Sequence, residues 1–174
     1  MIPGRGKQKG NAWENVVAKD LSLWLTNGVR ADTLERSPTS GGKSTVYRKA
    51  GERFSSIAGD LISVSEESQK FIDTFIVECK HRASIGLEQL IWTPSCAECL
   101  GGWWKKLLGE CEFHKKLPII VAKQNNRFPL IVFSKEGLQK FPRSYHTNVL
   151  FVYYPSGMYF LDYKNFLTLK YPGF

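Results

Sequence analysis

A short apolar run that ends in two charged residues constrains the fold of this chain more than any other feature. Within residues 71–80, FIDTFIVECK, residues 75–77 are consecutive and apolar. Such a run predicts a strand that is buried on both faces, as in a sheet covered by helices. Because side chains alternate along a strand, Glu78 and Lys80 would project from one face and Cys79 from the other. The strand therefore ends with a carboxylate and an ammonium group side by side.

The preceding segment, DLISV, predicts a second short strand that opens with Asp60. The segment SEESQK between the two strands is short, so we expect an antiparallel hairpin that brings Asp60 next to Glu78. Two carboxylates and the backbone carbonyl of Cys79 would form an oxygen-rich pocket that suits Mg²⁺. Lys80 beside it can orient or deprotonate water, or neutralise charge on a phosphate. The alternative is a strand that simply emerges into water at its charged end.

The first periodic segment, residues 11–27, predicts an amphipathic helix that begins at Asn11 and stops at Gly28. Glu14 projects into the middle of its apolar face. In one interpretation Glu14 completes a capping box with Asn11. In the other, Glu14 stays near the core because a cation or a metal ion compensates its charge. The helix alone leaves both interpretations open.

Basic residues are in surplus: 24 Lys and Arg against 16 Asp and Glu give a formal net charge of +8. A surplus of this size favours a polyanionic partner, and nucleic acid is the leading candidate. Residues 1–10 are predicted to be a flexible basic arm, and residues 35–60 a long loop whose SPTSGG segment offers hydroxyl and N–H groups to phosphate oxygens. The residues predicted to contact DNA are Arg5, Lys7, Lys9, Arg36, Ser37, Thr39 and Lys43.

The second half of the chain predicts a sheet with helices around it. Residues 94–113 have the apolar period of a helix, and LPIIVAK and FPLIVF read as two strands joined by the turn QNNR. Residues 149–163 predict a hairpin around Pro155 and Gly157. We therefore expect one α/β domain over residues 11–174, with a mixed central sheet flanked by helices.

A rival interpretation of this region is a zinc site. Its ligands would be Cys96, Cys99, Cys111 and His114, whose C-x-x-C and C-x-x-H spacing is typical of zinc ligands. One straight helix through residues 96–111 would separate the two pairs by more than about 20 Å at about 1.5 Å per residue, too far for shared coordination. The two interpretations exclude each other, and the unbroken apolar period favours the helix.

The order of these elements resembles the PD-(D/E)XK nuclease superfamily, and within it the archaeal and phage Holliday-junction resolvases. The resemblance rests on Glu14 in the first helix, the loop RSPTSGG, Gly59-Asp60 before a strand and Glu78-Cys79-Lys80 at the end of the next. It implies a restriction-endonuclease-like fold in which Lys80 assists the attacking water. It also implies that the metal is bound by Glu14, Asp60, Glu78 and the Cys79 carbonyl, and that Ser40 or Thr39 lies at the scissile phosphate. In the resembled family a basic or polar group at the end of the strand LPIIVAK lies near the site, which makes Lys123 a secondary candidate for DNA contact.

These observations predict a Mg²⁺-dependent structure-selective DNA endonuclease, most simply a Holliday-junction resolvase acting as a homodimer, in which Mn²⁺ can replace Mg²⁺. The product implied by the resemblance is a 5′-phosphate. One alternative is another nuclease of this chemistry, of restriction-like, repair or phage DNA-degrading type. The other is a non-catalytic, zinc-stabilised DNA-binding protein. Without an apolar run of about 18 residues or a secretory leader, we expect an intracellular, cytoplasmic protein, in the host cytoplasm if a phage encodes it.

Overall fold

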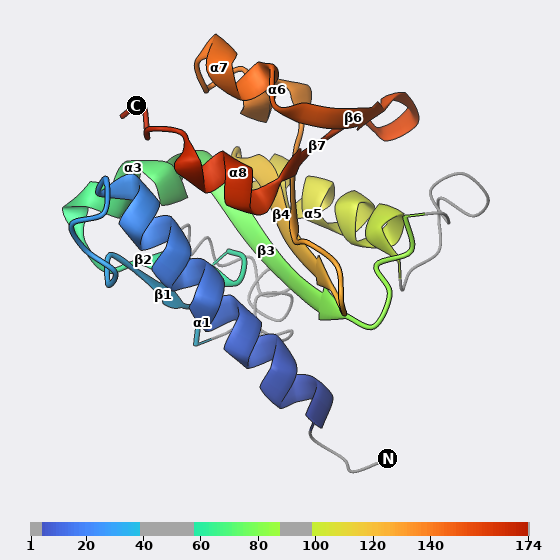
Figure 1. The fold of residues 1–174 in the computed structure, drawn as a ribbon, viewed down its shortest axis with the longest axis horizontal. Coiled ribbons are helices and arrows are strands. Elements are labelled where there is room, and N and C mark those ends of the chain that lie inside the picture. The colour runs from blue at the N-terminus through green and yellow to red at the C-terminus, as the bar shows by residue number, and fades with distance from the viewer. Residues whose placement is uncertain (1–4, 39–57, 88–98, 174) are drawn as a thin grey trace.

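The computed structural model describes residues 5–38, 58–87 and 99–173 of the chain. These residues form a five-stranded mixed sheet with helices on both faces and a two-stranded sheet beside it (Figure 1). The predicted α/β architecture, a mixed sheet flanked by helices, is confirmed. Among the described helices, none combines the length and the apolar character that crossing a membrane requires.

The described chain begins with a long helix, and strands and helices then follow in mixed order. In the first half they are α1 (Arg5–Leu25), β1 (Leu34–Arg36), β2 (Leu61–Ser63), α3 (Glu66–Thr74) and β3 (Phe75–Arg82). In the second half they are α5 (Leu100–His114), β4 (Leu117–Gln124), β5 (Leu130–Phe133), α6 (Lys135–Leu138), α7 (Arg143–His146), β6 (Val149–Tyr153), the 3-10 turn η2 (Tyr154–Ser156), β7 (Met158–Asp162) and α8 (Tyr163–Thr168).

The order of strands in the large sheet is β3-β4-β5-β7-β6. Strands β3 and β4 are parallel, and the remaining neighbours are antiparallel. A parallel pair needs a crossover connection, which α5 provides. Strand β3 is the first in the strand order and therefore lies at one edge of the sheet. Its outer backbone N–H and C=O groups can bind groups from elsewhere in the chain.

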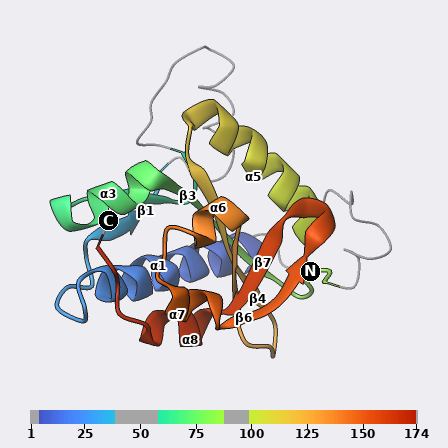
Figure 2. The same ribbon diagram turned by 90° about the horizontal axis from the view of Figure 1, so that it is seen from above.

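The sheet lies between helices (Figure 2). The buried apolar residues form two layers. Alternate residues of β3 point into different layers. Val77 and Cys79 pack with α1, whose Trp13 also donates a hydrogen bond from Nε1 to the Val121 carbonyl at 3.2 Å. Ile76 packs on the opposite face in the layer that includes residues of α5. Glu78 and Lys80 follow the same alternation and lie on the α5 side, at the end of the strand.

The predicted hairpin between residues 60–64 and 71–80 is wrong. Strand β2 pairs with β1 in the small sheet, and helix α3 occupies most of the connection to β3. Phe71 and Ile72 are buried from the helix instead of from a strand. Two acidic residues in the first turn favour this helix through its dipole, and Ser65 occupies its N-cap position.

The first helix is longer than predicted. It begins at Arg5, so residues 5–10 are helical and do not form the predicted flexible arm. Asn11 therefore lies inside the helix, which excludes the capping box with Glu14. Gly28 does end the helix: its φ is +89° and its N–H donates to the Leu23 carbonyl at 2.6 Å.

The predictions for the second half are largely confirmed. The two strands on either side of QNNR are β4 and β5, and the aromatic hairpin is β6 and β7. Helix α5 begins at Leu100, and the predicted helical residues 94–98 lie outside the described part of the chain.

Candidate active site

Asp60 is held against the open edge of β3. Its N–H donates to the Val77 carbonyl at 2.9 Å, and its Oδ2 accepts a hydrogen bond from the Cys79 N–H at 2.8 Å. The carboxyl group therefore sits at the backbone between Glu78 and Lys80. The sequence predicted this proximity, although through a hairpin that does not exist.

Gly59 makes this close approach possible. Its φ is +85°, a left-handed conformation that side chains disfavour. A Cβ at this position would lie 2.8 Å from the Val77 carbonyl oxygen and 2.8 Å from the Ile76 side chain. Any larger residue would push Asp60 away from β3, so the Gly-Asp pair is a geometric requirement of the site.

Burial and neighbouring charges both act on the carboxyl group of Asp60. Only 7% of Asp60 is exposed, and burial together with the charge of Glu78 raises its pKa to about 8, against the opposing influence of Lys80. Glu78 and Lys80 form an ion pair in which their side chains are 18% and 20% exposed. Burial lowers the pKa of Lys80, but the charges of Glu78 and Asp60 outweigh it, so the net shift is upward and Lys80 is an ammonium ion at neutral pH.

Glu14 of helix α1 forms an ion pair with Arg36 of β1. Its side chain is 12% exposed and that of Arg36 is 28% exposed. The charge of Glu14 also acts on Asp60, more weakly than that of Glu78. A cation therefore compensates Glu14, as one of the two sequence interpretations required, and that cation is a residue predicted to contact DNA.

The carboxylates are chemically suited to a hard divalent ion. Within the described ranges, no three or more His, Cys, Asp or Glu side chains converge as metal ligands. Asp60 and Glu78 nevertheless place two carboxylates in one partly buried environment, where burial first and the charge of Glu78 second raise the pKa of Asp60. A divalent cation would relieve this repulsion, and carboxylate oxygens are the ligands that Mg²⁺ and Mn²⁺ prefer. The residues present thus fit such an ion.

The same region does not support zinc. Cys99 is the N-cap residue of α5 and Cys111 lies near its end, so a helical rise of about 1.5 Å per residue separates them by about 18 Å. Both are buried cysteines, and burial raises the pKa of Cys111 to about 12. His114 is in the same helix, whereas Cys96 lies outside the described residues. The helical interpretation is confirmed for residues 100–114.

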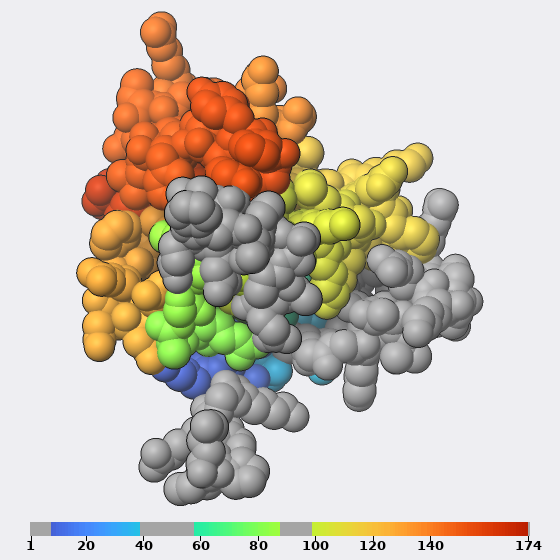
Figure 3. All heavy atoms as spheres, turned by 90° about the vertical axis from the view of Figure 1, so that its right-hand side faces the viewer, coloured from blue at the N-terminus to red at the C-terminus, as the bar shows by residue number. Residues whose placement is uncertain are grey.

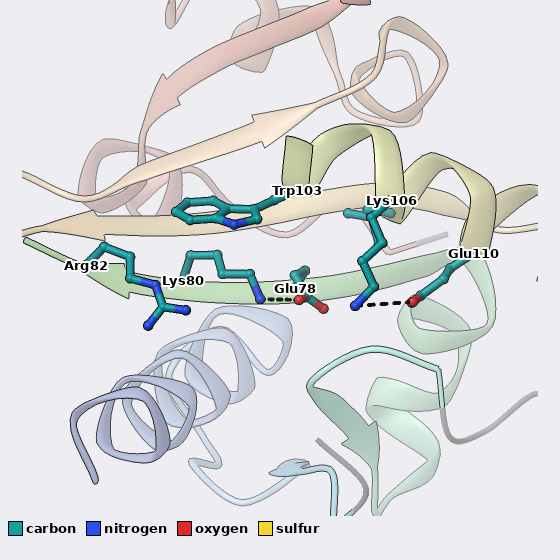
Figure 4. A pocket seen from close by; sticks show the side chains of 7 residues that line it. Glu78, Lys80, Arg82, Trp103, Lys106 and Glu110 are labelled. Carbon is teal, nitrogen blue, oxygen red and sulfur yellow. Dashed lines mark hydrogen bonds and ion pairs between the residues drawn. The ribbon is translucent and has the colours of Figure 1, made fainter. Parts of the chain in front are cut away.

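A cleft of about 250 Å³ opens on the α5 side of Glu78 and Lys80 (Figure 4). Trp103 forms one wall, and its ring centroid lies 6.0 Å from Lys80 Nζ. The apolar period of residues 94–113 predicted a helix there but did not reveal this wall. The lining residues are Glu78, Lys80 and Arg82 from β3 and Trp103, Lys106, Leu107 and Glu110 from α5.

A second group of basic side chains lies on the α1 side of the same strand end. Lys123 Nζ is 5.1 Å from the centroid of the Trp13 ring, and Lys9 donates to the Asn125 side chain. Burial and the charges of Lys9 and Lys123 lower the pKa of His81. In Figure 3 the green segment that includes the end of β3 reaches the surface above the blue atoms of α1. Lys9 and Lys123 are thus brought together there, as candidates for DNA contact.

The remaining predicted residues have varied positions. Ser37 is fully buried, and its N–H donates to the Asp60 carbonyl at 2.7 Å. It therefore helps to hold the backbone at Asp60, and its side chain is not exposed for the predicted contact with DNA. Thr39, Ser40 and Lys43 lie outside the described residues, as do the side chains of Arg5 and Lys7.

Comparison with known proteins gives one positive finding. The family model described as phage putative PDDEXK endonuclease matches residues 5–155, which include every element from α1 to β6. No curated protein and no solved structure matches the chain.

Proposed function

The chain belongs to the phage putative PDDEXK endonuclease family, which makes it a nuclease, and on this premise we propose that it is a Mg²⁺-dependent, structure-selective DNA endonuclease in which Mn²⁺ can substitute. The observation that carries the proposal is the buried carboxyl group of Asp60, hydrogen-bonded to the Cys79 N–H between Glu78 and Lys80. The reaction is hydrolysis of a phosphodiester by an activated water molecule.

The roles of the residues follow from their chemistry. Asp60 and Glu78 would hold the divalent ion through carboxylate oxygens, with the Cys79 carbonyl and Glu14 as further ligands. When bound, the ion supplies positive charge and Lewis acidity at the phosphate. Lys80 orients the attacking water and stabilises the negative charge that develops on the phosphate oxygens.

The substrate we propose is a branched DNA, and specifically a four-way junction. Support comes from the motif order shared with the Holliday-junction resolvases and from the net charge of +8. A junction with two-fold symmetry needs paired cuts, so the working form would be a homodimer. Arg5, Lys7, Lys9, Lys43 and Lys123 would hold the DNA backbone, with Ser40 or Thr39 at the scissile phosphate; contacts to the backbone recognise shape and not sequence.

Cleavage of matched substrates tests this proposal. A labelled four-way junction, the linear duplex made from the same sequence and each single strand would be incubated with the protein and Mg²⁺ or Mn²⁺. Symmetric cuts near the junction, with little cutting of the linear forms, are expected. Equal cleavage of all forms would point instead to a restriction-like, repair or DNA-degrading nuclease of the same chemistry, and no cleavage of any form would leave a DNA-binding protein.

A further inference from the structure

The cleft beside Glu78 has a second wall that the catalytic roles above do not use. Helix α5 contributes Trp103, Lys106 and Glu110 to it, on the side opposite β3. In Figure 4 the Lys106 side chain runs from α5 down to the level of the Glu78 carboxylate, with Lys80 on the other side of Glu78. The catalytic carboxylate is thus flanked by a cationic side chain from each wall.

The ion pair that now engages Lys106 is weak. Lys106 Nζ lies 4.0 Å from Glu110 Oε1, and the Lys106 side chain is 67% exposed. Exposed pairs at i,i+4 gain little because water and salt screen them and because the long side chains lose freedom. A phosphate, which carries a full charge and several acceptor oxygens, would compete effectively with Glu110 for this ammonium group.

The position and the lining of the cleft suit a DNA strand next to a cleaved bond. Its volume is about 250 Å³ and it is continuous with Glu78 and Lys80, the residues at the reacting phosphate. Its cations, Lys80, Arg82 and Lys106, suit a phosphodiester, and the indole of Trp103 gives an apolar wall for a sugar or a base. Glu110, with a side chain that is 15% exposed, opposes such a ligand by its charge.

We propose that Lys106 binds the phosphate adjacent to the scissile one beside the indole wall of Trp103, so that the DNA strand runs between β3 and α5. The inference rests on the proposed nuclease function for the identity of the strand, but the subsite itself requires only that the protein binds DNA. Glu110 then acts as the resting partner of Lys106 and lowers the affinity of the cleft for a polyanion.

The experiment measures binding of a labelled four-way junction and a linear duplex in EDTA, over a series of salt concentrations, so that no cleavage occurs. Lys106→Ala should weaken binding by about threefold to tenfold and reduce the slope of log K against log[salt] by about one, as expected for one lost phosphate contact. Lys106→Arg should retain both. Glu110→Gln should tighten binding by a few-fold, because it removes a negative charge from the cleft.

Neighbouring residues of α5 provide matched controls. Lys105 and Glu112 are exposed and do not line the cleft. Lys105→Ala and Glu112→Gln make the same charge changes on the same helix, and they should leave the salt slope and the affinity close to those of the wild type. Circular dichroism of all variants checks that α5 remains folded.

The outcomes separate this inference from the proposed function. Equal salt slopes for Lys106→Ala and Lys105→Ala would overturn the inference, even if the wild type cleaves DNA as proposed. A reduced slope for Lys106→Ala alone would support the subsite, even if the wild type cut no DNA with Mg²⁺ or Mn²⁺ and the nuclease proposal failed. In a cleaving wild type, Lys106→Ala should raise KM more than it lowers kcat.

Discussion

Replacement of Asp60 by asparagine should abolish cleavage and, without divalent ions, make the protein more stable at alkaline pH. The amide of asparagine is uncharged, as the protonated carboxyl group is, and its oxygen can still accept the hydrogen bond from the Cys79 N–H. The variant therefore keeps the geometry of the edge of β3 while it removes a buried charge beside Glu78. A residue kept for function at a cost to stability is the expected signature of a catalytic carboxylate.

The magnitude follows from the pKa of Asp60, which burial first and the charge of Glu78 second raise from 3.8 to about 8. The unfolded chain loses this proton near the lower value and the folded protein only near the higher one. The folded state therefore binds more protons between them, so wild-type stability falls as the pH rises through this window. The whole shift corresponds to at most about 6 kcal/mol at about 1.4 kcal/mol per pKa unit.

Movement of the Lys80 ammonium group toward Asp60 and entry of water reduce this upper value. We expect Asp60→Asn to raise the free energy of unfolding by about 2–4 kcal/mol at about pH 9, and by clearly less at about pH 5. Urea denaturation in EDTA at both pH values measures it. Asp73→Asn, on the exposed part of α3, is the matched control and should show no such pH dependence. A gain for Asp60→Asn that is the same at both pH values, or a loss at alkaline pH, would refute the reasoning.

Three further predictions follow from the contacts of the site. Gly59→Ala should destabilise the protein by about 2–4 kcal/mol in urea denaturation, because the added Cβ collides with β3 and the positive φ is strained. Gly28→Ala is the control: its φ is +89°, and an added Cβ there meets no atom within 4 Å, so the loss should be only about 1 kcal/mol. Equal losses for the two glycines would contradict the contact. A double-mutant cycle of Glu14→Gln and Arg36→Gln should give a coupling of about 1 kcal/mol in thermal unfolding, and additive losses would show that the pair contributes nothing. Lys80→Ala should lower the single-turnover cleavage rate by about 10²-fold to 10³-fold and weaken junction binding far less, and an unaltered rate would remove Lys80 from the reaction.

The sequence predicted which residues meet at the site better than it predicted how they meet. Alternation along residues 75–80 placed Glu78 and Lys80 on one face correctly, because that rule depends only on a local period. The route from Asp60 to Glu78 was wrong, since Phe71 and Ile72 lie close before the apolar run of β3 and resemble part of the strand although they belong to α3. The signals for that helix, Ser65 followed by two glutamates, were present in the sequence.

Contacts between segments that are distant in the sequence could not be predicted from local sequence patterns. The partner of Glu14 is Arg36, on a strand that pairs with β2 and not with the main sheet. The cleft between β3 and α5 depends on the crossover that makes β3 and β4 parallel, so Trp103 and Lys106 could be assigned to a helix but not to a site. The unusual position of Glu14 in an apolar face was a usable signal that a cation lay nearby.

Cleavage of a labelled four-way junction by the wild type and by Glu78→Gln, each with Mg²⁺ and with EDTA, tests the central claim most directly. The account predicts cutting by the wild type with Mg²⁺ alone, and no cutting by Glu78→Gln in either condition although it still binds the junction. The exposed Glu112→Gln should cut as the wild type does. Cutting that persists in EDTA, or in Glu78→Gln at the wild-type rate, would show that these carboxylates do not form a metal-dependent nuclease site.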